Sequence, residues 1–156
     1  MIRRQLVLCA LLISIMPAWA GAVVLVSDEE AALPPPRKGI AMRGAVHWPG
    51  ITFVSPAATA TETRSPFDFT VTFEPYRKAT ARKDAKPVSV LPESVKVLYL
   101  KTPIVDLTPR FEGRISANGI ELADVSLPVG THQIAIAVKD SAGHENLQTL
   151  TINVVK

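Results

Sequence analysis

The chain has little of what usually carries chemistry. It contains one cysteine, Cys9, and three histidines in 156 residues. Cys9 lies in an apolar stretch near the start, so removal of that stretch would leave no thiol for catalysis, metal binding or a disulfide. We expect His132 and His144 at opposite ends of one strand, roughly 30 Å apart, and His47 before the folded domain. The histidines therefore predict no shared metal ion.

A strong charge of one sign is also missing. The chain carries 17 basic and 14 acidic residues, a formal net charge of +3. Arg3 and Arg4 belong to the apolar start, and without them 15 basic residues face 14 acidic ones. A nucleic-acid-binding domain is usually strongly basic. The composition therefore predicts no nucleic-acid partner.

The one long apolar run lies at the beginning of the chain. Two arginines precede Leu6–Met16, and a proline and the small-x-small triplet Ala18-Trp19-Ala20 follow it. This order is typical of a secretory signal peptide, so we predict one over residues 1–20 and a periplasmic or secreted protein. The uncharged run continues to Val26, and its 21 residues from Leu6 are long enough for a membrane helix. An uncleaved anchor to residue 26 is the alternative, and only that form would involve a membrane.

Residues 21–50 have the composition of a linker. They contain an acidic cluster at 28–30 and three successive prolines at 34–36, with few large apolar residues. Proline runs favour extended, stiff spacers, and such segments cannot build a core alone. We predict a flexible tether here. A docking segment for a proline-reading partner is the alternative.

Period-two alternation predicts β-strands in the remainder, residues 51–156, where no stretch shows sustained helical periodicity. In Phe67–Phe73, apolar side chains alternate with Asp and Thr, and Asn118-Gly119 is typical of a hairpin turn. Other strands are expected at 51–54, 94–100, 104–107, 112–116, 120–125, 131–139 and 147–155. Short strands separated by Pro, Gly and Asn turns are typical of a β-sandwich. We therefore predict an all-β fold in one domain.

Three segments carry a resemblance to known domains. Leu127–Ile134 resembles the corner before the penultimate strand of bacterial immunoglobulin-like and fibronectin type III domains. Ala137–Gly143 is similar to the strand end and turn of bacterial surface Ig-like repeats, and Pro92–Val97 to their third strand. The resemblance implies a single immunoglobulin-like β-sandwich of about seven strands and no catalytic residue. It also implies a tyrosine near position 132, bonded back to the backbone, where this chain has His132.

The turn Asp140–Glu145 is the one place where reactive residue types gather in a short stretch. Its two carboxylates are too few for calcium, which needs six or more oxygens. We expect Asp140 to bond the backbone of its own turn. Ser141 and His144 share that tight turn with it, and three members of one turn cannot easily form a catalytic relay. We therefore predict no enzyme, no metal and no cofactor.

The connection after the Phe67–Phe73 strand is the most charged segment. It carries five basic residues against one acidic residue, Asp84. Such a segment can contact lipid head groups, an anionic glycan or an acidic envelope protein, and a solvated loop is the alternative. The predicted contact residues for an anionic partner are Arg77, Lys78, Arg82, Lys83 and Lys86.

Together these features predict a non-enzymatic exported binding or structural accessory protein of the bacterial cell envelope. The alternative function is a periplasmic metal-handling or hydrolytic domain. It would need polar residues converging from loops at one end of the sandwich. The candidates for that set are Asp106, Arg110, Glu112, Arg114 and Asp124.

Overall fold

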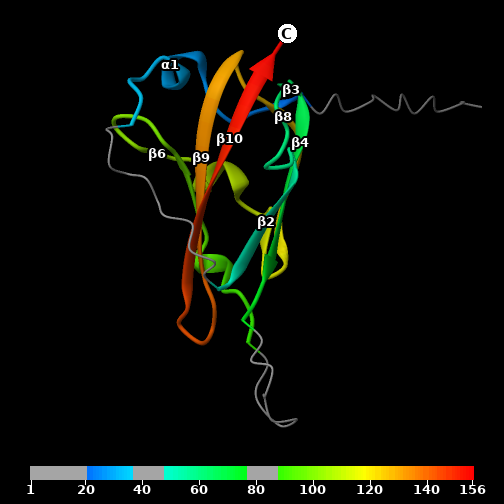
Figure 1. The fold of residues 1–156 in the computed structure, drawn as a ribbon, viewed down its shortest axis with the longest axis vertical. Helices are drawn as coiled ribbons and strands as arrows, with labels where there is room; N and C mark the ends of the chain where they lie inside the picture. Colours follow the sequence, from blue (N-terminus) through cyan, green and yellow to red (C-terminus); the bar gives the residue numbers. More distant parts are fainter. Residues whose placement is uncertain (1–20, 37–47, 77–87) are drawn as a thin grey trace, which may run out of the picture.

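The computed structural model describes residues 21–36, 48–76 and 88–156. In these residues the chain is all-β, with ten strands in two mixed sheets and one short helix (Figure 1). The apolar side chains of both sheets form one core, an arrangement compatible with a β-sandwich. None of the helices in the described ranges is long and apolar enough to cross a membrane.

The first sheet contains the strand with the clearest alternation. Phe69, Val71 and Phe73 of β4 are buried, as the sequence pattern predicted, while Phe67 is half-buried at the strand start. Antiparallel partners lie on both sides of β4, and β1 joins β8 in parallel. The strand order is β1 (Val23–Val24), β8 (Gly119–Ser126), β4 (Phe67–Glu74) and β2 (Gly50–Ser55), with β7 (Ile115–Ser116) also paired to β8.

The second sheet is built on a long antiparallel hairpin. Its two strands pair continuously from Gly130 opposite Val154 to Lys139 opposite Glu145, and the alternating apolar residues of both strands face the core. The strand order is β3 (Thr63–Arg64), β10 (Glu145–Val155), β9 (Gly130–Lys139), β5 (Lys96–Tyr99) and β6 (Val105–Asp106). β3 runs parallel to β10, and the other pairs are antiparallel. The expected strands 131–139 and 147–155 are therefore confirmed.

Two 3-10 helices, η1 (Pro92–Ser94) and η2 (Thr108–Phe111), connect strands of this fold. η2 ends directly before the expected strand 112–116, and residues 112–114 continue it as a turn in which the Arg114 amide donates to the Phe111 carbonyl, so only the short β7 forms there. Phe111 at its end is fully buried and packs on Phe69, with ring centroids 5.5 Å apart. The following hairpin turns at Ala117-Asn118, one residue earlier than the expected Asn118-Gly119 turn, because Gly119 already pairs with Ser116 as the first residue of β8. Gly119 has a φ of 155°, and a side chain there would collide with the Val71 carbonyl.

The prediction of a flexible tether over residues 21–50 is wrong for residues 21–36. We name residues 21–36 the N-terminal arm. The arm contains β1 and the short helix α1 (Asp28–Ala31), and Leu25 and Val26 are 0% and 1% exposed in the common core. Only these two residues of the apolar run 23–26 pack between the sheets, because Val23 and Val24 are 36% and 59% exposed. The domain therefore begins before residue 51.

The arm is fixed by polar contacts along its length. The Leu25 amide donates to the Ser126 carbonyl at 3.0 Å, and a capping box between Ser27 and Glu30 starts α1. Arg110 bonds both carboxylate oxygens of Glu30, at 2.8 and 2.6 Å, and also the Leu25 carbonyl. The Arg110 hydrogen bonds lower the pKa of Glu30 to about 2.

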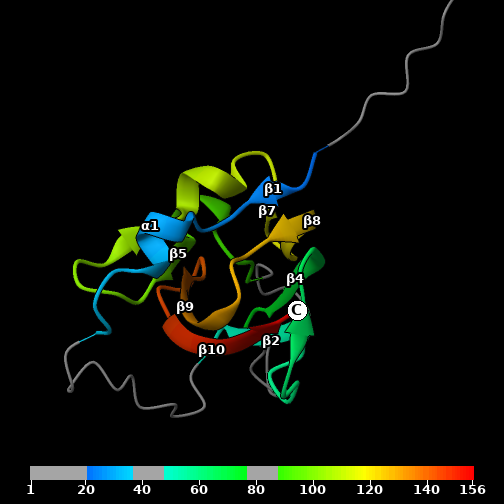
Figure 2. The same cartoon turned by 90° about the horizontal axis from the view of Figure 1, so that it is seen from above.

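Further along, the arm reaches the second sheet. Lys101 donates to the Ala31 carbonyl at 2.8 Å, and the Thr102 amide donates to the Pro34 carbonyl at 2.9 Å. Seen from above, the arm passes from β1, beside β8, across to α1 near β5 (Figure 2). It thus closes one open side between the two sheets.

His132, at the start of β9, bonds both the β8–β9 connection and β5. Its Nε2 lies 2.8 Å from the Pro128 carbonyl, and its Nδ1 lies 2.9 Å from the Tyr99 hydroxyl. A carbonyl can only accept, so Nε2 carries the proton, and the Tyr99 hydroxyl donates to Nδ1. Burial lowers the pKa of His132. The neutral histidine therefore ties the corner back to the backbone at the place where the resemblance implies a tyrosine.

Candidate functional site

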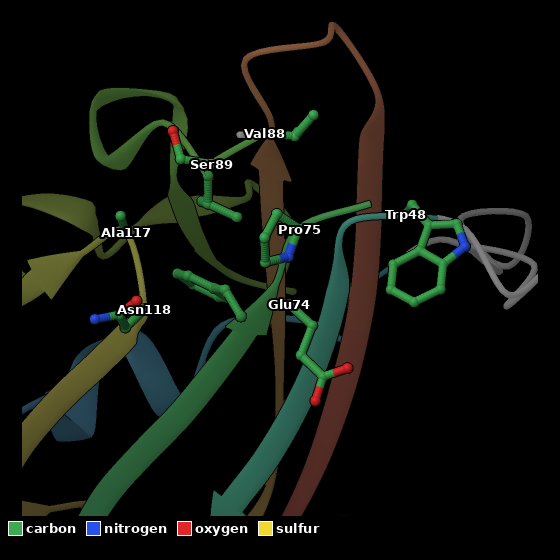
Figure 3. Close-up of a pocket in the computed structure, with 9 residues that line it drawn as sticks. Trp48, Glu74, Pro75, Val88, Ser89, Ala117 and Asn118 are labelled. Atoms are coloured by element: carbon green, nitrogen blue, oxygen red, sulfur yellow. The ribbon is translucent and has the colours of Figure 1, made fainter. Parts of the chain in front are cut away.

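A pocket of about 580 Å³ opens at the end of the fold where β9 and β10 are joined, which we name the pocket pole (Figure 3). Its lining comes from four separate parts of the chain: Trp48 before β2, the end of β4, the approach to η1 and the β7–β8 turn. The lining residues are Trp48, Phe73, Glu74, Pro75, Val88, Ser89, Val90, Ala117 and Asn118. A mixed lining of apolar side chains with a few polar groups is typical of small-molecule sites.

The strand register explains how the walls of the pocket are held. Gly50 lies opposite Glu74, and a Cβ at Gly50 would lie 3.3 Å from the Glu74 Cβ and 3.7 Å from the Trp48 ring. The missing side chain leaves room for the indole beside these strand ends. On the other wall, the Phe73 amide donates to the Asn118 carbonyl at 2.8 Å, which fixes the β7–β8 turn against β4.

Three rings run from the pocket wall to the β9–β10 turn. The centroids of Trp48 and Tyr76 are 5.8 Å apart in an edge-on arrangement, and those of Tyr76 and His144 are 4.9 Å apart. Trp48 nevertheless keeps 38% of its surface exposed. An exposed aromatic ring held by its neighbours offers apolar contact area at little cost in conformational entropy.

The β9–β10 turn is organised around a buried carboxylate. Asp140 is 1% exposed and accepts the backbone N–H groups of Ala142 and His144, each at 2.9 Å. Its other oxygen lies 2.9 Å from His144 Nδ1. Burial would raise the pKa of Asp140, but the hydrogen bonds from His144 and Ala142 outweigh it and hold the pKa below its usual value. The prediction that Asp140 bonds its own turn is confirmed.

Ser141 bonds the backbone of Ser89. Its hydroxyl accepts the Ser89 amide at 3.2 Å, and its own amide donates to the Ser89 carbonyl at 2.8 Å. These bonds, with a backbone bridge between Val90 and Asp140, attach the β9–β10 turn to the pocket lining. The turn therefore helps to hold Ser89 and Val90, two residues of the pocket lining, in place.

The predicted contact residues for an anionic partner, Arg77, Lys78, Arg82, Lys83 and Lys86, lie outside the described residues. The described residues on either side of them belong to the pocket pole. Tyr76 packs between Trp48 and His144, and Val88 lines the pocket. The two described residues that flank the basic segment in sequence therefore both lie at the pocket pole.

The alternative set of polar residues does not form one site. Asp106 accepts the Thr108 amide at 2.8 Å, Arg110 binds Glu30, and the Asp124 amide donates to Asp68 at 3.2 Å. The set thus divides among a turn, the N-terminal arm and the β4–β8 pair. Asp106 and Glu112 share only the rim of a shallow depression of about 300 Å³. The described ranges also hold no group of three or more His, Cys, Asp or Glu residues placed for a metal ion.

Sequence reasoning missed the contribution of Trp48. The composition places Trp48 in the tether, although it is one of two tryptophans in the chain and lies three residues before the expected strand 51–54. A large aromatic residue beside Pro49 and Gly50, at a strand start, is the signal that could have been used. Comparisons of the chain with protein-family models, curated proteins and solved structures found no match. Its function is therefore inferred from the geometry of the pocket pole.

Proposed function

We propose that this chain is an exported, non-enzymatic binding module of the bacterial cell envelope, built as an immunoglobulin-like domain. The strand order supports this architecture. The order β2, β4, β8, β7 corresponds to strands A, B, E and D of such domains. The order β10, β9, β5, β6 corresponds to G, F, C and C′. The bond from His132 to the Pro128 carbonyl takes the place of the corner tyrosine before strand F.

The observation that carries the binding function is where the pocket lies. In this correspondence its lining comes from the B–C connection, the D–E turn and the residues bonded to the F–G turn. Variable immunoglobulin domains bind their ligands with B–C and F–G loops at that same end. Exposed Trp48 adds an aromatic surface from the chain before strand A.

The proposed ligand is an acidic glycan of the envelope. The pocket is of the size that holds a small ligand, and Trp48 can stack on a sugar ring while Glu74, Ser89 and Asn118 offer polar groups. The basic segment between Tyr76 and Val88 supplies five positive charges against one negative. Positive charge beside a pocket attracts an anionic ligand and raises its association rate.

Binding to a purified acidic polysaccharide, compared with its neutral counterpart, tests this function. We expect Trp48→Ala to weaken binding by about tenfold, since a stacking ring contributes on the order of 1–1.5 kcal/mol. Reversing the charge of Arg77, Lys78 and Arg82 should abolish the preference for the acidic form. Arg64→Glu, a charge reversal in β3 away from the pocket lining, is the matched control and should leave binding unchanged.

Equal binding by wild type, Trp48→Ala and the charge-reversed chain would refute the proposal. Binding to an acidic envelope protein but to no polysaccharide would refute the glycan as ligand. Circular dichroism of each variant confirms that the fold is retained before binding is compared.

A further inference from the structure

Glu74 is the one charged side chain in the described lining of the pocket. Its carboxylate forms no hydrogen bond or ion pair with the residues that the structure describes, whereas the carboxylate of Glu30 is paired with Arg110. The rest of the lining is aromatic, aliphatic or neutral and polar (Figure 3). This part of the pocket therefore carries a negative charge that no described neighbour neutralises.

Glu74 starts beside the Trp48 ring, at the same wall of the pocket. Gly50 lies opposite Glu74 in the β2–β4 pair. A Cβ at Gly50 would be 3.3 Å from the Glu74 Cβ and 3.7 Å from an atom of the Trp48 ring. Because both side chains border this one glycine, a group bound over the indole lies within reach of the Glu74 carboxylate.

The Trp48 indole has a face available for a ligand. Trp48 is 38% exposed, and its contact with Tyr76 is edge-on, with an angle of 63° between the ring planes. Tyr76 can therefore cover at most one face of the indole. The face of a tryptophan ring attracts a cation placed within about 6 Å of its centroid. A carboxylate beside the ring adds charge-assisted hydrogen bonds to an ammonium group.

The Glu74 carboxylate repels an acidic ligand unless that ligand also brings a positive charge. A like charge left unpaired in a binding site lowers the affinity for the wrong partner and so adds specificity. A glycan whose amino sugars are all N-acetylated has no cation to place beside Glu74, whereas a protonated free amino group pairs with a carboxylate. The charge of the lining thus favours a glycan with free amino groups.

We infer that the space between Trp48 and Glu74 binds the ammonium group of an amino sugar that is not N-acetylated. This inference rests on the proposed function and narrows its ligand to an acidic glycan that also carries free amino groups. The ammonium group enters the pocket, pairs with Glu74 and lies over the indole. The acidic groups of the glycan stay outside this part of the pocket.

The probe for this site is a hyaluronan oligosaccharide, an acidic glycan with N-acetylated amino sugars, and the same oligosaccharide after removal of its N-acetyl groups. Binding of both forms to the full chain is measured by calorimetry at a pH where the sugar amine is protonated. We expect the form with free amino groups to bind about tenfold more tightly, because it gains a cation–π contact and an ion pair.

Variants of Glu74 assign this gain to its carboxylate. Glu74→Gln keeps the size of the side chain and should reduce the gain to about threefold or less, since only the contact with the indole remains. Glu74→Lys should reverse the preference, so that the N-acetylated form binds more tightly. Glu62→Gln, which removes an exposed carboxylate next to β3 and outside the pocket lining, is the matched control and should keep the full gain. Circular dichroism confirms the fold of each variant.

Equal binding of both forms by wild type, or an unchanged gain in Glu74→Gln, would overturn this inference and leave the proposed function standing. Binding of neither form would also overturn it, while the comparison of acidic with neutral polysaccharides decides the proposed function separately. A lysine tripeptide that binds as tightly as the form with free amino groups, with the same dependence on Glu74, would overturn the amino sugar as the source of the cation.

Discussion

Acidification should weaken the fold through the buried histidine of the β8–β9 corner. Burial lowers the pKa of His132 below its ordinary value of 6.5, so the folded protein binds this proton less readily than the unfolded chain. Its contribution to stability is therefore complete above about pH 6.5 and declines as the pH falls below that value toward the folded pKa. One such proton allows a slope of up to about 1.4 kcal/mol per pH unit.

The carboxylates whose pKa values are shifted leave a window in which this effect can be measured. The pKa of Glu30 is lowered to about 2, and those of Asp106 and Asp140 are also lowered, so their effects on stability begin below about pH 4.5. The free energy of unfolding by urea, measured from pH 7.5 to 4.5, should therefore decline in the lower part of this range.

Two variants assign the decline to His132. His132→Gln keeps an N–H group that can reach the Pro128 carbonyl but does not titrate, so it should remove this part of the pH dependence. Tyr99→Phe leaves Nδ1 buried without its donor and should cost about 1–3 kcal/mol at pH 7.5. His144→Gln, in the β9–β10 turn, should retain the decline. An equal slope in wild type and His132→Gln would refute the reasoning.

Three further changes test the arm and the sheets by urea unfolding. Leu25→Ala should cost about 2–5 kcal/mol, and a loss below 1 kcal/mol would contradict the burial of the arm. Glu30→Gln should cost about 1–2 kcal/mol at pH 7, because Arg110 loses its charge partner while both side chains keep part of their water contact. That difference is present above pH 4.5 and should vanish as the pH falls toward 2; a constant difference would contradict the lowered pKa. Gly119→Ala should cost about 2 kcal/mol or more, since its Cβ meets the Val71 carbonyl, and unchanged stability would contradict that close approach.

Local pattern was enough to predict most of the sheets. Alternation in Phe67–Phe73 and along β9 and β10 sets which side chains face the core, and this information lies within each strand. The role of Asp140 was equally local, because its hydrogen-bond partners are two and four residues away.

The N-terminal arm could not be found in the same way. Residues 23–26 are apolar like the residues before them, and only the completed packing shows that Leu25 and Val26 belong to the core while Val23 and Val24 are exposed. The fixing partner, Arg110, lies 80 residues from Glu30 in sequence. A local signal did exist: Ser27 and Glu30 have the spacing of a capping box, which marks the start of a helix.

The sequence did not predict the pocket pole, for a related reason. Trp48, Tyr76 and His144 come from three separate connections, and only the completed strand order brings their rings together. The basic segment predicted from charge, Arg77, Lys78, Arg82, Lys83 and Lys86, lies outside the described residues and stays a prediction.

Both ends of the described chain leave the fold at the same extremity. Gly21 precedes β1, and the C-terminus follows β10, at the end opposite the β9–β10 turn (Figure 1). A strand of ten residues spans about 33 Å, so a molecule immobilised through either terminus would project its Trp48 opening that far from the support. Fusion partners or sensor chips attached at these termini would leave that opening unobstructed.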